Sequence, residues 1–239
     1  MNYQERTYRN RVSNNNLIPF QVCVRETDLF ILSDSDLFDI ALQSIYRHRG
    51  FIESYIKGRQ DFLTSLVPLD EDNLAPNIVR DMLKTSLEAG VGPMASVAGA
   101  IAEYVGNDLL ALSRNVIVEN GGDIFLKTER ETMISIFAGE SPLSYNVNLL
   151  LKPEKMPLGV CTSSGTVGHS LSLGNADAVC VMAKSSTMAD AAATAVGNLV
   201  ESKKDIKMAL ERGIEIEGVS GILIIVGDNF GAIGEIELA

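Results

Sequence analysis

The sequence contains no tryptophan, only three cysteines and no long apolar run, and these absences exclude several classes of protein. Three cysteines without a CxxC pair cannot form a disulfide framework, which favours a reducing compartment. The longest apolar stretch, residues 221–227, has the length of a strand, whereas a membrane-spanning helix needs about 18 or more apolar residues. The first residues are polar and lack the apolar segment of a signal peptide. We therefore expect a cytoplasmic protein that does not bind membranes.

Positive charge is also scarce, because 20 Lys and Arg face 31 Asp and Glu, for a net charge of −11. Such a surface repels phosphate backbones, so nucleic-acid binding is not expected, although a small anion could still bind locally. Arg47, His48 and Arg49 form a basic cluster on one predicted helix. Two interpretations stay open, a solvated helix face or a phosphate contact.

The apolar periodicity predicts an α+β fold with mostly antiparallel sheets and packed helices. A hairpin with its turn at Thr27 and Asp28 is expected near the N-terminus. Helices are predicted over 37–56 (with a break at Gly50), 76–88, 94–112, 188–201 and 203–212, and strands over 115–119, 123–128, 132–138, 145–151, 177–183, 221–227 and 231–239. Residues 159–175 are predicted to be a polar, glycine-rich loop. We expect a single domain over residues 1–239, with a candidate subdomain boundary in the loop 67–77.

The segment ENGGDIFLK (119–127) places two glycines between apolar strands. Gly121 and Gly122 allow positive φ and let a ligand approach the backbone, and Asp123 could accept hydrogen bonds or face a cation. An ordinary hairpin turn explains the same pattern.

The segment CTSSGTVGH (161–169) gathers hydroxyls and glycines that could cradle phosphates through backbone amides. The alternative is an ordinary Ser- and Gly-rich loop. His169 could contact a ligand or donate a proton, or it could be a turn histidine bonded to backbone.

The segment TMADAAATAVGNL (187–199) places Asp190 and Thr194 one turn apart on a predicted helix. A carboxylate and a hydroxyl on one face offer two hard oxygens to Mg²⁺ or Ca²⁺. The alternative is a helix-start charge with a threonine bonded to its own helix.

In order and spacing, these segments resemble the ApbE family, the FAD:protein FMN transferases. VIVENGGDI resembles that family's strand with GGD, CTSSG its TSG loop, and TMADAAATAV its ADAxxTA signature. The resemblance covers about residues 94–200, and a related cytoplasmic branch of the family is the best match. Where the family has AKGxxxD, this chain has Ala98 for the lysine and Glu103 for the aspartate.

The resemblance implies an ApbE-like (T-fold-like) core that binds FAD or FMN with Mg²⁺. The metal ligands would be Asp190, Thr194 and a backbone carbonyl near Val97. The remaining cofactor-binding residues would be Gly121, Gly122, Asp123, Thr162, Ser163, Ser164 and Gly165. Flavin transfer or pyrophosphate hydrolysis is the implied activity, with a protein partner as acceptor and a homodimer as the expected assembly.

Two other hypotheses stay open. Cys161 lies beside amide donors, where a thiol with a depressed pKa could carry sulfur as a persulfide. The resembling branch is associated with sulfur assimilation, although a small buried residue is the alternative explanation of Cys161. The third hypothesis is a non-catalytic binding module with a decayed cleft.

Overall fold

The computed structural model describes residues 17–165 and 174–239, and its centre is an eight-stranded antiparallel sheet. The strand order is β1-β2-β3-β4-β7-β8-β9-β10. Their bounds are β1 (Ile18–Val24), β2 (Thr27–Ser33), β3 (Val116–Asn120), β4 (Asp123–Lys127), β7 (Leu158–Ser163), β8 (Ala178–Ala183), β9 (Val219–Val226) and β10 (Asn229–Gly234). The predicted α+β class with mostly antiparallel pairing is therefore confirmed.

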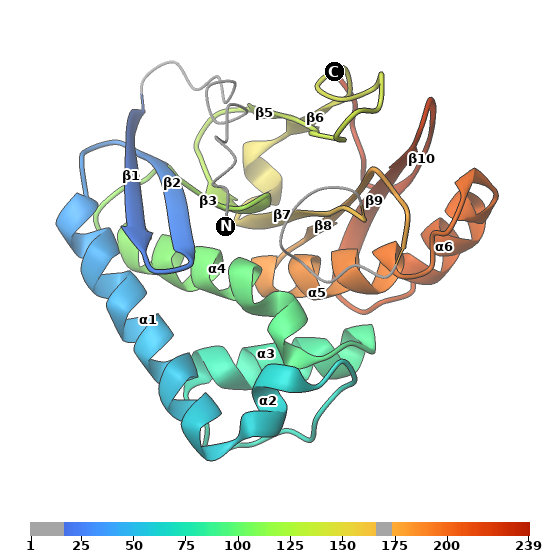
Figure 1. Cartoon of the computed structure of the whole chain (residues 1–239). Helices are drawn as coiled ribbons and strands as arrows, with labels where there is room; N and C mark the ends of the chain where they lie inside the picture. The colour runs from blue at the N-terminus through green and yellow to red at the C-terminus, as the bar shows by residue number, and fades with distance from the viewer. Residues whose placement is uncertain (1–16, 166–173) are drawn as a thin grey trace.

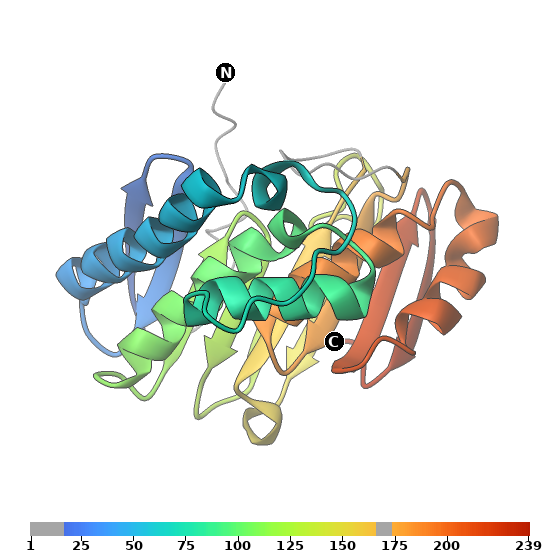
Figure 2. The same ribbon diagram turned by 90° about the horizontal axis from the view of Figure 1, so that it is seen from below.

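The helices cover one face of this sheet, and a small second sheet covers the other (Figures 1 and 2). The helices are α1 (Phe38–Gly58), α2 (Gln60–Thr64), α3 (Asn77–Ala89), α4 (Val97–Leu110), α5 (Ser186–Gly197) and α6 (Ile206–Gly213). Short 3₁₀ turns η2 (Pro93–Ser96), η3 (Pro153–Lys155) and η4 (Lys203–Asp205) lie between them. The small sheet pairs β5 (Thr132–Ser135) with β6 (Asn148–Leu151).

Three apolar clusters hold these layers together. One packs α1, α3 and α4 on the first strands, and another packs α5 and α6 on β7, β8 and β9. The third lies between the large sheet and the β5–β6 sheet. The central strands are consequently buried on both faces, which explains why β8 reads as a continuous apolar run rather than an alternating one.

The main error of the sequence-based prediction concerns residues 159–175. Residues Leu158–Ser163 form β7, a central strand between β4 and β8, rather than the beginning of a loop. A glycine suits position 159 of this strand because α5 lies against it, and a Cβ there would approach the Ser186 nitrogen to 2.6 Å. Two smaller corrections apply: α1 continues through Gly50, and the first hairpin turns at Arg25 and Glu26.

The loop 67–77 joins α2 to α3, and whether it bounds a subdomain stays a prediction. In the part of the chain that the structure describes, no helix combines the length and apolar character needed to cross a membrane.

Candidate functional site

The GGD segment forms the tight turn between β3 and β4. Gly121 and Gly122 have φ values of 71° and 109°, and Asn120 pairs with Asp123 across the turn. The hairpin interpretation is therefore correct, because two consecutive positive φ values require glycine-like freedom. The turn also meets the next motif, since the Thr162 amide donates to the Gly122 carbonyl at 3.2 Å.

The TSSG segment begins on β7 and leaves the sheet beside this turn. Cys161 lies opposite Asp123 in the ladder, and its thiol contacts the Ser186 carbonyl of α5 at 3.4 Å. Strand alternation places Ser163 on the same, helix-covered face as Cys161. The Ser163 hydroxyl is buried and has no hydrogen-bond partner among residues 17–165 and 174–239. An unpaired buried hydroxyl calls for an explanation, and a bound ion or water is one of the known ones.

The ADAxxTA segment lies on α5, which begins after the N-cap residue Ser185. Asp190 and Thr194 are one turn apart, as expected. Oδ2 of Asp190 accepts a hydrogen bond from the Gly99 amide at 2.8 Å, at the first turn of α4. Burial raises the pKa of the Asp190 carboxyl to about 7, although the amides of Gly99 and Ala98 act in the opposite direction. The residue keeps an intermediate exposure, so solvent can still reach it.

Cys161 shows that the three motifs lie close together. Its thiol is completely buried, and its pKa is raised by burial first and then by the charges of Asp123 and Asp190. One carboxylate comes from the GGD turn and the other from α5. The same contacts disfavour a thiolate at neutral pH, so the geometry supports a packing role for Cys161 and gives no support to the persulfide hypothesis.

Sequence reasoning missed the capping function of Glu103. Its Oε2 accepts hydrogen bonds from the Ser185 hydroxyl at 2.7 Å, the Thr187 amide at 2.9 Å and the Thr187 hydroxyl at 2.8 Å. A carboxylate at a helix N-terminus satisfies free amides and suits the helix dipole. Glu103 lies one turn after Gly99 on α4, so α4 grips α5 at two successive turns. The family's aspartate at this position was the only signal for it.

Asn120 was also missed, because Asn-Gly was interpreted only as a turn signal. Its side-chain amide donates to the Ala98 carbonyl at 3.0 Å, at the beginning of α4. Asn120 is buried and thereby connects the β3–β4 hairpin to the same helix end that holds Asp190.

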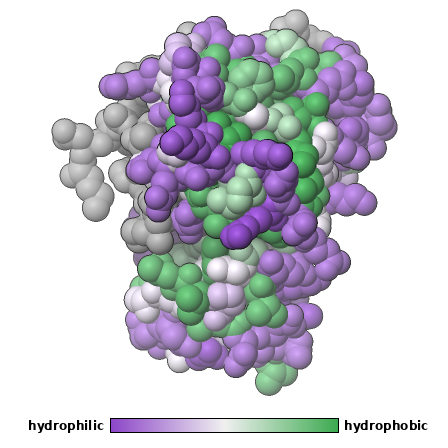
Figure 3. All heavy atoms as spheres, turned by 90° about the vertical axis from the view of Figure 1, so that its right-hand side faces the viewer, coloured by the Kyte–Doolittle hydropathy of each residue, from purple (hydrophilic) through white to green (hydrophobic). Residues whose placement is uncertain are grey.

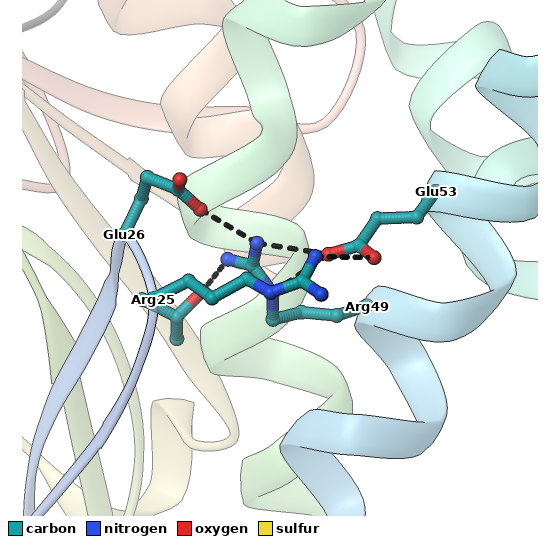
Figure 4. A network of polar contacts seen from close by, with 5 residues as sticks. Arg25, Glu26, Arg49 and Glu53 are labelled. Carbon is teal, nitrogen blue, oxygen red and sulfur yellow. Dashed lines mark hydrogen bonds and ion pairs between the residues drawn. The ribbon is translucent and has the colours of Figure 1, made fainter.

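The basic cluster does not supply free cations, which answers the question left open above. Figure 4 shows Arg49 between Glu53 at 2.9 Å and Glu26 at 2.7 Å, with Arg25 also bonded to Glu53. Helix α4 lies between α1 and α5 (Figure 1), so this network lies away from the Asp190 motif.

The other two members of the cluster pair with Asp108 of α4. The Arg47 guanidinium contacts Asp108, and Nε2 of His48 lies 2.8 Å from the same oxygen. His48 is buried, contrary to the expected exposed face. The phosphate-contact interpretation therefore has no support.

The chemistry of Asp190 and Thr194 fits a hard cation. The Asp190 carboxylate forms no ion pair with any described residue, and a cation nearby would favour its charged form. Within residues 17–165 and 174–239, no three His, Cys, Asp or Glu side chains cluster as metal ligands. The protein would therefore supply few ligands, and phosphate and water oxygens would supply the others, as is usual for Mg²⁺. The carbonyl near Val97 stays a prediction.

A surface groove of about 350 Å³ lies where α3, α5 and α6 end. Its lining is mostly small and apolar, with Asn198 and Arg212 as polar members. Figure 3 views the molecule from the side of α6 and β10, where hydrophobic residues (green) lie among hydrophilic ones (purple). The volume is within the range of small-molecule sites, roughly 300–1,000 Å³. His169 lies outside the described residues, and its role stays a prediction.

Known proteins with similar sequences match most of this chain. The sequence profile of the family described as "AbpE bacteria" matches residues 9–237. The chain is 42% identical to a UPF0280 protein of Methanococcus aeolicus over 92% of this chain and 91% of that protein. It is 45% identical to a UPF0280 protein of Methanocaldococcus jannaschii over 90% of each chain.

Solved structures share the fold at low sequence identity. The apo flavinyl transferase ApbE of Pseudomonas stutzeri superposes with a TM-score of 0.60 at 13% identity, over 91% of this chain and 94% of that one. The apbe protein of Thermotoga maritima gives a TM-score of 0.55 at 13% identity, over 90% and 96%. These similarities show a common fold.

Proposed function

The chain belongs to the family described as "AbpE bacteria", and on that premise we propose that it binds a flavin nucleotide or a related phosphate-bearing ligand together with Mg²⁺. The observation that carries the proposal is the convergence of three motifs on one place. The GGD turn, the TSSG strand end and the Asp190 turn of α5 meet around Cys161. The fold shared with the flavinyl transferase ApbE of Pseudomonas stutzeri adds support for a flavin as ligand.

The ligand would be held by neutral donors rather than by basic side chains. In this proposal the Ser163 hydroxyl would donate to a phosphate oxygen, and the glycine turn would let the ligand approach the backbone. Asp190 and Thr194 would hold the metal. This arrangement explains how a chain with net charge −11 could bind a dinucleotide although Arg47 and Arg49 are paired with carboxylates.

The proposed reaction is cleavage of the pyrophosphate of the dinucleotide. With water as acceptor, one P–O bond to the bridging oxygen of the FAD pyrophosphate breaks, and FMN and AMP form. With a hydroxyl of a partner protein as acceptor, FMN becomes attached to that oxygen, the hydroxyl proton is released and AMP leaves. A bound Mg²⁺ would neutralise and orient the pyrophosphate. Gly99 and Glu103 would hold α5, and with it Asp190, in place during this reaction.

The test is a calorimetric titration of FAD into the protein with and without MgCl₂. We expect wild type to bind FAD more tightly with Mg²⁺, and Asp190→Ala to lose most of the metal-dependent gain. Asp70→Asn is the matched control, because Asp70 is an exposed loop carboxylate and its change should leave binding unaltered. Absence of FAD binding at millimolar concentration in wild type would contradict the proposal.

Product analysis then separates the remaining alternatives. Chromatography of FAD incubated with protein and Mg²⁺ should show AMP and FMN in equal amounts if pyrophosphate is hydrolysed. Binding without any product, also in the presence of candidate acceptor proteins, would favour the non-catalytic module.

A further inference from the structure

The peptide group between Ala98 and Gly99, at the beginning of α4, forms side-chain hydrogen bonds through both its carbonyl and its amide. The carbonyl of Ala98 accepts from the side-chain amide of Asn120 at 3.0 Å, and the amide of Gly99 donates to Asp190 at 2.8 Å. This carbonyl and this amide belong to the same peptide unit, which is planar and rigid. Fixing the orientation of the carbonyl therefore fixes the direction in which the Gly99 amide points.

Asn120 is not needed for the turn beside it. The turn is made by Gly121 and Gly122, and Asn120 is already a strand residue paired with Asp123. Its side chain is buried against α4. A buried amide in this place needs a function, because burying a polar group is unfavourable unless it is hydrogen-bonded.

We propose that Asn120 is a positioning residue for Asp190, acting through the Ala98–Gly99 peptide. An amide whose carbonyl also accepts a hydrogen bond is polarised and becomes a stronger donor. The Asn120 contact thus strengthens and directs the Gly99 hydrogen bond to Oδ2 of Asp190. The orientation of the carboxylate toward its proposed metal follows from this contact.

The Ala98–Gly99 peptide connects two motifs that are 70 residues apart in the sequence. Asn120 precedes the GGD turn, and Asp190 belongs to ADAxxTA. Asn120 and Asp190 are both hydrogen-bonded to the Ala98–Gly99 peptide. A ligand that moves the β3–β4 hairpin therefore also moves the Gly99 amide, which donates to Asp190. Outer-shell partners of this kind typically alter metal affinity by about 10–100-fold. This consequence for metal binding rests on the function proposed above.

The experiment compares wild type with Asn120→Ala and Asn120→Asp in the full chain, using two readouts. The first is the amide proton chemical shift of Gly99 in the metal-free protein, with Asp190→Ala as the reference for a lost hydrogen bond, because alanine has no acceptor oxygen. We expect both Asn120 variants to move this signal toward its position in Asp190→Ala. The second is the affinity for MnCl₂, used as a Mg²⁺ substitute and followed by electron paramagnetic resonance, which should fall on the order of tenfold.

Asn107→Ala is the matched control, because Asn107 is exposed on the same helix, and it should change neither readout. A folded Asn120→Ala protein with an unchanged Gly99 signal would overturn the positioning role. If wild type binds no Mn²⁺ even with FAD, the proposed function fails, and the Gly99 signal still decides the positioning role. A shifted Gly99 signal with unchanged Mn²⁺ affinity would overturn the claim that Asn120 affects metal binding, and the positioning of Asp190 would stand.

Discussion

The amide of Gly99 lies 2.8 Å from Oδ2 of Asp190, so the beginning of α4 and the second turn of α5 are in direct backbone-to-carboxylate contact. This contact is possible because residue 99 is glycine. A Cβ there would lie 2.2 Å from the Ser186 carbonyl oxygen and 2.8 Å from the Asp190 Cβ. The absence of a side chain therefore brings the two helices together at the candidate site.

Gly99→Ala should consequently destabilise the protein although alanine favours helices. Overpacking in a rigid core typically costs about 1–3 kcal/mol. The measurements are the urea concentration at the unfolding midpoint and the affinities for FAD and Mg²⁺. All three should be lower in Gly99→Ala than in wild type. Gly50→Ala is the control, because Gly50 lies within α1 with no atom near its would-be Cβ. That change should stabilise the protein by up to about 1 kcal/mol. Equal effects of the two changes would contradict the close-contact explanation.

Replacement of Glu103 should loosen α5 at its N-terminus. Glu103→Ala removes an acceptor shared by Ser185 and Thr187 and should destabilise the fold by roughly 2 kcal/mol, the usual range for charged hydrogen bonds. Glu103→Gln keeps an acceptor oxygen and should therefore destabilise the fold less than Glu103→Ala. Hydrogen exchange of the Thr187 amide should accelerate in both variants. Glu211→Gln provides the control, because Glu211 is largely exposed and lies 3.8 Å from Lys207.

The pair His48 and Asp108 should make the protein less stable in acid. Burial, the main cause, lowers the pKa of His48 below its usual 6.5 despite the nearby Asp108 carboxylate. The neutral tautomer with its proton on Nε2 agrees with this geometry, because Nδ1 is buried and has no hydrogen-bond partner in the part of the chain that the structure describes. A proton on Nδ1 would therefore leave a buried, unbonded N–H. The pKa of Asp108 is lowered by its hydrogen bonds and by nearby positive charge, against the effect of burial.

The lowered pKa values of His48 and Asp108 determine how the free energy of unfolding changes with pH. A histidine with a lowered folded pKa favours the unfolded state as the pH falls below 6.5, because the unfolded chain then binds more protons. Asp108 adds a contribution that is lost below about pH 4. The difference in unfolding free energy between wild type and His48→Gln should therefore decrease from pH 7.5 toward pH 5. A difference that is constant with pH would show that His48 does not titrate in this window.

The three thiols should differ strongly in reactivity. Cys23 is exposed, whereas Cys161 and Cys180 are buried, and burial raises the pKa of Cys180 to about 12. An aromatic disulfide reagent at pH 8 should therefore label one thiol in the native protein and three after denaturation. Cys23→Ser should abolish the native labelling. Persulfide formation at Cys161 of the folded protein on polysulfide treatment would revive the sulfur-carrier hypothesis.

The sequence by itself determined most of the local structure and the location of the motifs. Apolar periodicity and the paired glycines predicted a hairpin, helices and a turn that the structure contains. These features depend on neighbours within a few residues, so they can be read along the chain. The family resemblance rests on the same kind of short segment.

Only the tertiary structure decided which side chains form hydrogen bonds and ion pairs with one another. Glu103 caps a helix that begins 83 positions later, Asn120 bonds the start of α4, and Arg49 is neutralised by Glu26 of the hairpin. The sequence-based prediction missed strand β7, where Gly159 is explained by the close approach of α5, which local periodicity does not encode. Hydrogen bonds and ion pairs depend on which surfaces the packing of the apolar faces brings together. The sequence placed Asp190 on a helix, and the packing of α4 against α5 gave its carboxylate a fixed orientation.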